Sequence, residues 1–391
     1  MRRTTVKVRD LINWILIVMF GASFILPIFQ MQVNPYLVVF LSLVSIFLGT
    51  KQLSSDIKKQ CLILTFFVMY GFITILYNSG GIGGIYTTVS GCVLFLASRE
   101  IKFSGKQVLF IIVCLLILNI YWTIQSPTWY ELSFYDHWRG DGTLTNSNGV
   151  GKYICYSAIL IYICLRQSNN KIIKYLRYIL LGSSIWGIYN VRARISLLVI
   201  CVFVLLDFWL YLSKNKNVFI KYTFCFAIIA EIVFPFIYLM MYYYGIGSNI
   251  KMFGLSEKGL YSGRQTIWLQ ALGGMNSLGD WFLGVGSNQE YWTGHVLNMH
   301  NNFMNLLVVV GVIGTIFFIV FLYNMVVKNY DANNKYIWQN QLMLFFIVVL
   351  LEGCTDITIF YNDFNLYIYL PLGIACSSKI RKRAENDIEG I

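Results

Sequence analysis

Long apolar segments alternate with short polar connections along almost the whole chain. Most of these segments are 15 to 25 residues long, the length that an α-helix needs to cross the hydrocarbon core of a bilayer. They lack the alternation of apolar and polar residues that outer-membrane barrel strands show. The pattern therefore predicts an all-α, polytopic membrane protein with twelve transmembrane helices, at residues 10–30, 34–50, 60–77, 84–98, 107–125, 149–165, 173–190, 195–213, 220–245, 301–327, 337–359 and 364–378.

The composition agrees with this class of protein. Of the 391 residues, 57% are hydrophobic and 12% are charged, whereas soluble domains carry about 25% charged residues. With only five prolines, most of the spans are expected to be continuous helices. The first apolar segment has no small-residue cleavage site, so we interpret it as a retained span. The whole chain, 1–391, is predicted to form a single integral membrane domain.

The positive charges indicate the orientation of the helices. The formal net charge is +12, but 23 of the 30 Lys and Arg residues lie in alternate connections and at the two termini. This is the positive-inside pattern, which predicts that both termini are cytoplasmic. An even number of spans likewise places both termini on the same side of the membrane. The distribution argues against nucleic acid as a partner.

Two long connections are predicted on the outer side, at residues 126–148 and 246–300, and both are rich in aromatic residues and glycine. One interpretation of their tryptophans is a belt at the level of the lipid headgroups. The alternative is that they form platforms on which sugar rings stack. The candidate glycan-binding residues are Trp138, Trp268 and Trp292.

Several arginines lie on the predicted outer side, against the orientation rule. Arg192 and Arg194 flank a short turn between two spans, and Arg139 and Arg264 lie in the two long connections. They could reach lipid phosphates at the bilayer surface. They could also bind a diphosphate, because a guanidinium is always charged and grips phosphate oxygens with two parallel donors.

His300 stands at the start of the tenth predicted span and is the candidate catalytic residue. An imidazole titrates near neutral pH and can act as a general base. The alternative is that Asn301 caps the helix and His300 is incidental. His295 and His300 do not share a helical face, so neither a metal nor a cofactor is expected.

Glu352 and Asp356 are candidate supporting acids. They are spaced i, i+4 near the outer end of the eleventh predicted span, which would place them on one helical face. We expect them to pair with Arg192 or Arg194 more than to act in the site directly.

Four sequence segments resemble the O-antigen polymerase/ligase family, and they occur in the order of that family along residues 139–327. They are Arg139 with GTLTNSN; VRARISLLV; SGRQTIW followed by LGDWFLGVG; and MHNNFMNLLVVVGVIG. In the second segment either Arg192 or Arg194 matches the arginine of the family, because Ala193 and Ile195 stand where the family often has Ser and Gly; Arg194 is favoured.

The resemblance implies a GT-C-like, metal-independent, inverting glycosyltransferase at the outer face of a bacterial plasma membrane. Its donor would be a glycan on undecaprenyl diphosphate, with Arg194 and Arg264 on the diphosphate and His300 as the base. A polymerase of O-antigen, capsular or exopolysaccharide repeat units is favoured. A chain-length regulator and a flippase of the same pathway would be its partners. The alternatives are an O-antigen ligase, which transfers polysaccharide to the lipid A core, and a lipid-linked oligosaccharide flippase or other transporter.

Overall fold

The computed structural model describes residues 2–29, 33–49, 55–78, 83–99, 105–136, 147–168, 170–246, 263–286, 299–359 and 365–377. These residues form helices and connections and contain no strand. The longer helices are α1 (Arg2–Ile25), α2 (Pro35–Gly49), α3 (Ser55–Asn78), α4 (Gly83–Ser98), α5 (Gly105–Asp136), α6 (Ser147–Arg166), α7 (Lys171–Asn190), α8 (Arg194–Leu212), α9 (Lys216–Tyr243), α10 (Arg264–Gly274), α11 (Leu278–Leu283), α13 (Asn302–Tyr323), α14 (Ile337–Glu352) and α15 (Asn365–Cys376).

Each of the twelve predicted spans coincides with one of these helices. Within the described ranges, seven segments are long and apolar enough to cross a membrane: 10–29 and the segments in α3, α5, α6, α8, α9 and α13. Four shorter apolar helices lie in α2, α4, α14 and α15. The chain is therefore a polytopic, all-helical membrane protein.

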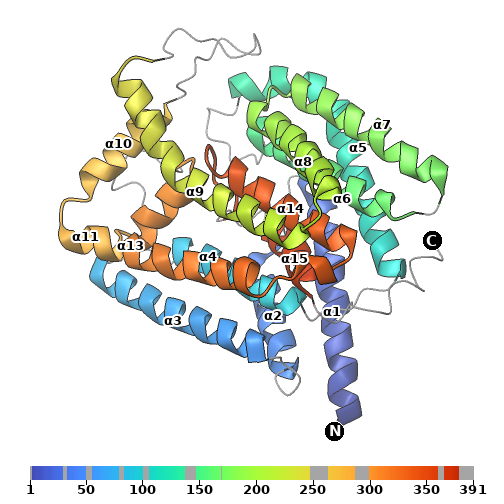
Figure 1. Cartoon of the computed structure of the whole chain (residues 1–391), viewed down its shortest axis with the longest axis horizontal. Coiled ribbons are helices and arrows are strands. Elements are labelled where there is room, and N and C mark those ends of the chain that lie inside the picture. The colour runs from blue at the N-terminus through green and yellow to red at the C-terminus, as the bar shows by residue number, and fades with distance from the viewer. Residues whose placement is uncertain are drawn as a thin grey trace.

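The core of the molecule surrounds α14 and α15, which occupy the middle of the bundle in Figure 1 (orange-red and red). Both helices are apolar on all sides, and almost every residue in them is buried. A helix that is apolar on all sides belongs inside a protein or a membrane. The N-terminal half of α6 packs beside them and is equally buried.

The peripheral helices expose apolar side chains instead. Leu76 of α3 is 83% exposed, and Phe226 of α9 is 64% exposed. Soluble proteins rarely expose apolar side chains over such broad surfaces. Lipid is the environment that these surfaces fit.

Helix α13 is broken, although the sequence predicts one continuous span at 301–327. Gly311 has φ 65° and ψ −173°, which divides α13 into two arms. The backbone of residues 284–286 packs against the break: Val285 N donates to Val308 O (2.7 Å) and Gly286 N donates to Val309 O (3.2 Å). Broken backbone at membrane depth is tolerated when other groups satisfy its hydrogen bonds.

Two glycines make this contact possible. A Cβ atom added at Gly284 would lie 2.5 Å from the backbone nitrogen of Gly311, and one at Gly311 would collide with the carbonyl of Phe282. The hydroxyl of Tyr70 lies 2.8 Å from the carbonyl oxygens of both Phe282 and Val310. This span is an exception to the expectation that most spans are continuous helices, and the break depends on a contact with another segment.

Both long connections that the sequence predicts on the outer side contain helical residues in the described ranges. Residues 126–136 continue α5, so only residues between α5 and α6, outside the described ranges, remain of the expected loop 126–148. The expected loop 246–300 contains α10 and α11. In α11 a capping box between Ser277 and Asp280 starts the helix, and α10 buries one apolar face that includes Ile267 and Ala271.

Candidate functional site

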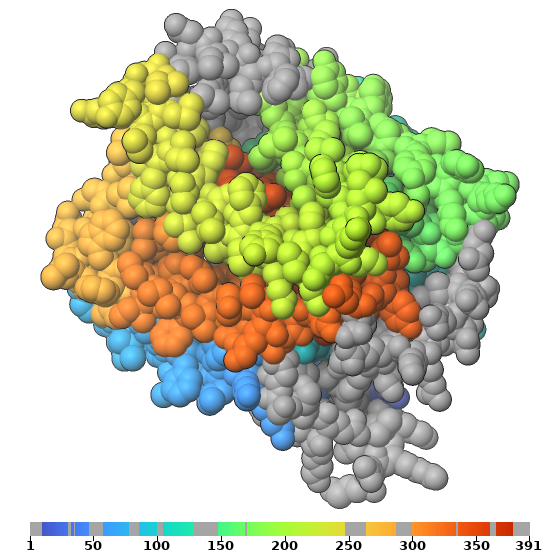
Figure 2. Space-filling view, viewed as in Figure 1, coloured from blue at the N-terminus to red at the C-terminus, as the bar shows by residue number. Residues whose placement is uncertain are grey.

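Ionisable side chains from distant parts of the chain gather at one end of the helix bundle. They come from α6, the start of α8, the start of α10, the residue pair before α13, and the end of α14 with its following turn. Figure 2 shows red atoms of the C-terminal region at the bottom of a hollow between α8 (yellow-green) and α9 (yellow). The residues of this polar cluster are Lys152, Arg194, Arg264, His300, Glu352 and Asp356.

Asp356 contacts two other residues of the polar cluster, Lys152 and His300. Its Oδ2 lies 2.8 Å from Lys152 Nζ and its Oδ1 lies 3.2 Å from His300 Nδ1. Lys152 Nζ also donates to the carbonyl of Ile357 (3.0 Å). Burial alone would raise the pKa of Asp356, but Lys152 and His300 outweigh it and hold that pKa below its usual range. Asp356 is therefore an ionised carboxylate.

His300 is oriented by this carboxylate. In the tautomer in which Nδ1–H donates to Asp356, Nε2 carries the lone pair of the ring. The side chain is 23% exposed, so it reaches the surface of the site. The backbone of His300 has φ 48°, an uncommon conformation for a residue with a side chain. Such conformations cost about 1–3 kcal/mol and cluster at functional sites.

Asn301 fixes the chain immediately after His300. Its Oδ1 accepts from the backbone N–H of Met304 (2.7 Å), and its Nδ2 donates to the carbonyl of Cys354 (3.0 Å). The predicted helix cap is confirmed. The cap and the His300–Asp356 contact coexist, so the capping of α13 does not make His300 incidental.

Glu352 is held by hydroxyl groups. Tyr156 donates to its Oε2 (2.6 Å) and Ser196 to its Oε1 (3.2 Å). Arg192 and Arg194 were the predicted partners of Glu352 and Asp356, but the observed partners are Tyr156, Ser196, Lys152 and His300. The i, i+4 argument fails because α14 ends at Glu352, so Asp356 lies in the turn that follows.

Arg264 and Arg194 approach the same cluster from α10 and α8. Arg264 is the first residue of α10, and its Nε donates to the carbonyl of Thr355 (2.8 Å). Burial lowers the pKa of Arg264, and the charge of Arg194 lowers it further. Asp356 and Tyr238 raise the same pKa. The charges of the two arginines therefore act against each other, and a bound anion would reduce that repulsion.

Arg192 lies on the turn between α7 and α8, two residues before Arg194. It is exposed and has φ 56°. Arg194 is half-buried and begins α8, whose N-cap residue, Ala193, provides no side-chain hydrogen bond. The N-terminus of α8 therefore presents backbone N–H groups and a positive dipole beside the arginines, an arrangement that suits anions.

Trp268 does not form the predicted sugar platform. Its side chain is fully buried, its Nε1 donates to the carbonyl of Met299 (2.6 Å), and its ring packs edge-on against Tyr238. No face of the ring is open to a ligand. Trp268 instead anchors α10 to the residue that precedes His300. The candidates Trp138, Arg139 and Trp292 lie outside the described residues.

Lys152 belongs to the polar cluster but is not among the candidate residues that the sequence predicts. It is a single base in the buried half of an apolar helix, and an ionisable residue in that setting is a functional candidate by itself. Its partner, Asp356, is far away along the chain, so the ion pair could not be deduced from spacing. The described residues contain no group of three or more His, Cys, Asp or Glu that could hold a metal ion.

Comparison of the chain with protein-family profiles, with curated proteins and with solved structures finds no match. The chemistry of the site must therefore be deduced from its geometry. The polar cluster offers an oriented imidazole, an ionised carboxylate and two converging guanidinium groups. This combination can remove a proton at one point and stabilise negative charge at another.

Proposed function

We propose that the protein is a glycosyltransferase that joins lipid-linked oligosaccharide repeat units into a polysaccharide. The donor is a glycan on undecaprenyl diphosphate, and the product is an O-antigen, capsular or exopolysaccharide chain. The observation that carries the proposal is the His300–Asp356 pair lying in one polar cluster with Arg264 and Arg194.

In this proposal the arginines hold the leaving group. When the glycosidic C–O bond to the diphosphate breaks, negative charge develops on the diphosphate oxygens. Fixed cations that face the developing charge lower the barrier. Arg194 and Arg264 supply that charge with forked donors, and the N-terminus of α8 adds backbone donors. Arg192 is a further candidate for the same anion, and Arg139 stays a candidate from the sequence alone.

His300 acts as the general base. Its Nε2 takes the proton of the acceptor hydroxyl as that oxygen attacks the anomeric carbon from the face opposite the diphosphate, so the configuration inverts. Asp356 holds the ring in the required tautomer and stabilises the imidazolium that forms, as carboxylates do for catalytic histidines. No metal takes part in this mechanism.

The proposed topology has twelve spans, both termini in the cytoplasm and a GT-C-like arrangement. The elements of the polar cluster support it. The starts of α6, α8 and α13 and the ends of α9 and α14 lie on one side if every predicted span crosses the membrane. The positive-inside rule makes that side the outer one. The membrane would be the plasma membrane of a bacterium.

Two other functions remain to be separated from the polymerase. A ligase would use the same donor but transfer the finished polysaccharide to a lipid A core sugar. A flippase or other transporter is favoured by one observation, the break in α13, since discontinuous helices often form substrate sites in transporters. The break lies at Gly311, however, and the carbonyls around it accept hydrogen bonds from the backbone of Val285 and Gly286 and from the hydroxyls of Tyr70 and Thr315, so they are not open to a ligand.

The test uses purified protein in liposomes with a single lipid-linked repeat unit. A polymerase yields longer lipid-linked glycans, resolved by gel electrophoresis or mass spectrometry, and one repeat unit on its carrier accumulates in a deletion strain. A ligase leaves long chains on the carrier in that strain. Movement of the lipid across the bilayer without lengthening would contradict the proposal and favour the transporter.

A further inference from the structure

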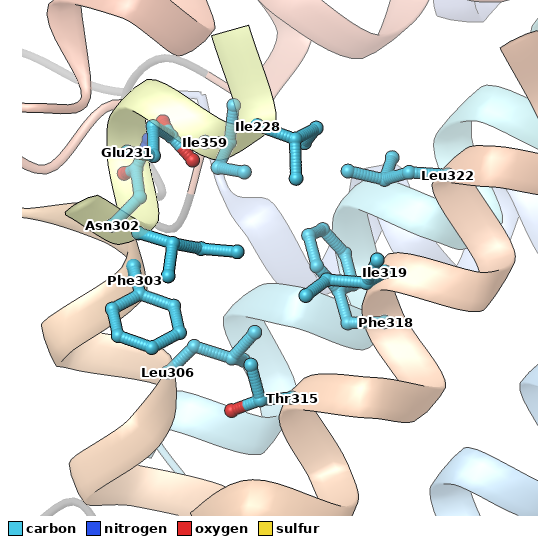
Figure 3. A pocket seen from close by; sticks show the side chains of 11 residues that line it. Ile228, Glu231, Asn302, Phe303, Leu306, Thr315, Phe318, Ile319, Leu322 and Ile359 are labelled. Atoms are coloured by element: carbon cyan, nitrogen blue, oxygen red, sulfur yellow. The ribbon is translucent and has the colours of Figure 1, made fainter. Parts of the chain in front are cut away.

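Glu231 is a buried acidic residue in the middle of α9 that has no part in the proposed mechanism. It is 5% exposed. A carboxyl group inside a membrane helix is costly unless it is hydrogen-bonded, and such residues tend to be functional. Figure 3 shows its side chain close to Asn302 at the start of α13, and the amide of Asn302 donates to Glu231 Oε1 (2.7 Å). Since Asn302 follows His300 by two residues, this hydrogen bond connects α9 to the segment of His300.

The backbone carbonyl of Glu231 contacts the same segment. Pro235, four residues further along α9, has no N–H group and cannot donate to this carbonyl as another helix residue would. The side-chain amide of Asn301 lies there instead, with Nδ2 3.4 Å from the Glu231 oxygen. The same nitrogen donates to the carbonyl of Cys354 (3.0 Å). Glu231 therefore accepts hydrogen bonds from both asparagines that follow His300.

Asn302 joins the segment of His300 to the turn that carries Asp356. Its Nδ2 donates to Thr358 Oγ1 (2.9 Å), and its Oδ1 accepts from the backbone N–H of Thr358 (2.9 Å). Its backbone N–H donates to the carbonyl of Gly353 (2.9 Å). Each of the two side-chain partners stands two positions after a member of the His300–Asp356 pair, so their contacts hold the two segments together beside that pair.

The hydrogen bond to Glu231 fixes the Asn302 amide. Both N–H groups of the amide have acceptors, Glu231 Oε1 and Thr358 Oγ1. A buried donor that loses its acceptor is unfavourable, so without Glu231 the amide would turn toward another partner and leave Thr358. Gly353 makes room for this arrangement, because a Cβ atom there would collide with Asn302 Nδ2 and Glu231 Oε1.

We propose that Glu231 is a positioning residue that holds the His300 ring against Asp356. The inference rests on the proposed function, in which His300 is the general base. The backbone of His300 has φ 48°, and a strained residue keeps its conformation only where its surroundings determine it. Glu231 supplies part of that restraint from a separate helix, acting through Asn301 and Asn302.

Glu231→Leu tests the role, because it removes the acceptor and places an apolar side chain of similar size. Glu231→Gln is the conservative variant, since it keeps an oxygen to which Asn302 can donate. Thr223→Val is the matched control: it removes a side-chain hydrogen bond of α9, from Thr223 Oγ1 to the carbonyl of Phe219 (2.7 Å), outside the polar cluster. Glu231→Met replaces the Leu variant if gel filtration shows that the latter is not monodisperse.

The first readout is the polymerisation of a lipid-linked repeat unit by the full-length protein in nanodiscs. Glu231→Leu is expected to lower kcat about 10²-fold, as a small misplacement of a catalytic group does, with an unchanged KM for the donor. Glu231→Gln should recover most of the activity. In the His300→Ala background the Leu substitution should have no further effect, because the group that it displaces is gone. A merely structural role would lower activity equally in both backgrounds, which would contradict the proposal.

The second readout does not depend on the reaction. Diethyl pyrocarbonate acylates the free nitrogen of a histidine ring, and mass spectrometry distinguishes His300 from the two other histidines of the chain. Asp356 stabilises the cation that forms on the ring. Glu231→Leu should therefore slow the labelling of His300 about tenfold, as the loss of a hydrogen bond to a charged group implies. Glu231→Gln and Thr223→Val should label like the wild type. Equal or faster labelling of His300 in Glu231→Leu would overturn the proposal.

The two readouts separate this inference from the proposed function. If Glu231→Leu slows the labelling of His300 but the wild-type protein never lengthens the glycan, the polymerase is contradicted and the positioning role stands. If the wild type lengthens the glycan and Glu231→Leu both labels and polymerises normally, the positioning role is contradicted and the polymerase stands.

Discussion

At the scale of single residues, the proposed mechanism assigns different roles to His300 and Arg264. His300→Ala is expected to lower kcat by about 10²–10⁴-fold, the usual contribution of a general base, and to leave donor binding unchanged. Arg264→Ala is expected to weaken donor binding as well, because the arginine contacts the diphosphate in the ground state. The measurements are single-turnover kinetics and donor binding in nanodiscs.

Gln270→Ala is the matched control for the Arg264 variant. Gln270 lies on the same helix, α10, and is exposed, so its loss should change neither quantity. Arg264→Lys should recover only part of the activity, since an ammonium group lacks the forked geometry of a guanidinium. Near-normal turnover in His300→Ala would exclude the histidine as the base.

The buried ion pair between Lys152 and Asp356 makes a second prediction. Their side chains are 4% and 9% exposed, and removal of one partner of such a pair leaves an uncompensated buried charge. Asp356→Asn should therefore lower the stability by about 3–5 kcal/mol, and the double variant Lys152→Met with Asp356→Asn should recover part of the loss. Thermal unfolding in detergent measures both; a single variant as stable as the wild type would contradict the pairing.

The pH dependence of this pair follows from the lowered pKa of Asp356. A carboxyl whose pKa is lower in the folded state than in the unfolded state stabilises the fold above its unfolded pKa, about 3.9. That contribution is lost as the pH falls from there through the folded pKa. Asp356→Asn should therefore show less acid destabilisation than the wild type below about pH 4.

The sequence could predict part of the site at this scale. The sequence predicts Arg194, Arg264 and Asp356 as candidates because charged groups near membrane spans are costly, and His300 because an imidazole can act as a base near neutral pH. Their partners could not be identified. The ion pair with Lys152 and the burial of Trp268 depend on contacts between segments that are distant along the chain, and a tryptophan in an outer connection has the same sequence signature whether it is buried or open.

At the scale of helices, the sequence predicted a helix at each of the twelve positions, because a long apolar segment in a helix satisfies its own backbone hydrogen bonds. Within the described residues, seven segments are long and apolar enough to cross a membrane, so twelve spans stay a prediction. The sequence did not predict the break in α13. A glycine within an apolar span is common in membrane helices, and nothing in the segment itself shows that the backbone of Gly284 approaches it.

The break gives a third prediction. Gly311→Ala should reduce the yield of folded protein, because its φ and ψ lie in a region that is essentially restricted to glycine and costs another residue about 1–3 kcal/mol, and the added Cβ would meet the backbone of Phe282. Gly284→Ala should behave in the same way. Gly273→Ala in α10 is the control: its Cβ would meet nothing within 4 Å, and alanine favours a helix. Equal yields of all three variants, measured by fluorescence-detected gel filtration, would show that the break is not required for folding.

At the scale of the whole molecule, the packing explains why the helices differ in character. The buried α14 ends at the polar cluster, whereas α3, α8 and α9 expose apolar side chains that fit a lipid environment. The hydropathy pattern does not distinguish these two groups, because a helix core and a lipid both select apolar residues. The sequence therefore predicted a polytopic helical protein but not the layers in which its helices lie.

The orientation of the whole molecule is the last prediction. If the twelve proposed spans all cross the membrane and the basic connections are cytoplasmic, α10 and α11 lie outside, on the same side as the polar cluster. A reporter enzyme that is active only outside the membrane should work when fused near residue 280 and fail when fused after residue 380. Fusions in the connection between α8 and α9, which carries Lys214 and is followed by Lys216 at the start of α9, should also fail. Activity at the C-terminal and α8–α9 positions with silence near residue 280 would place the arginines and His300 in the cytoplasm. The cytoplasm contains nucleotide sugars, which can serve as donors, so a site there would not need a lipid diphosphate donor. That result would contradict the proposed reaction.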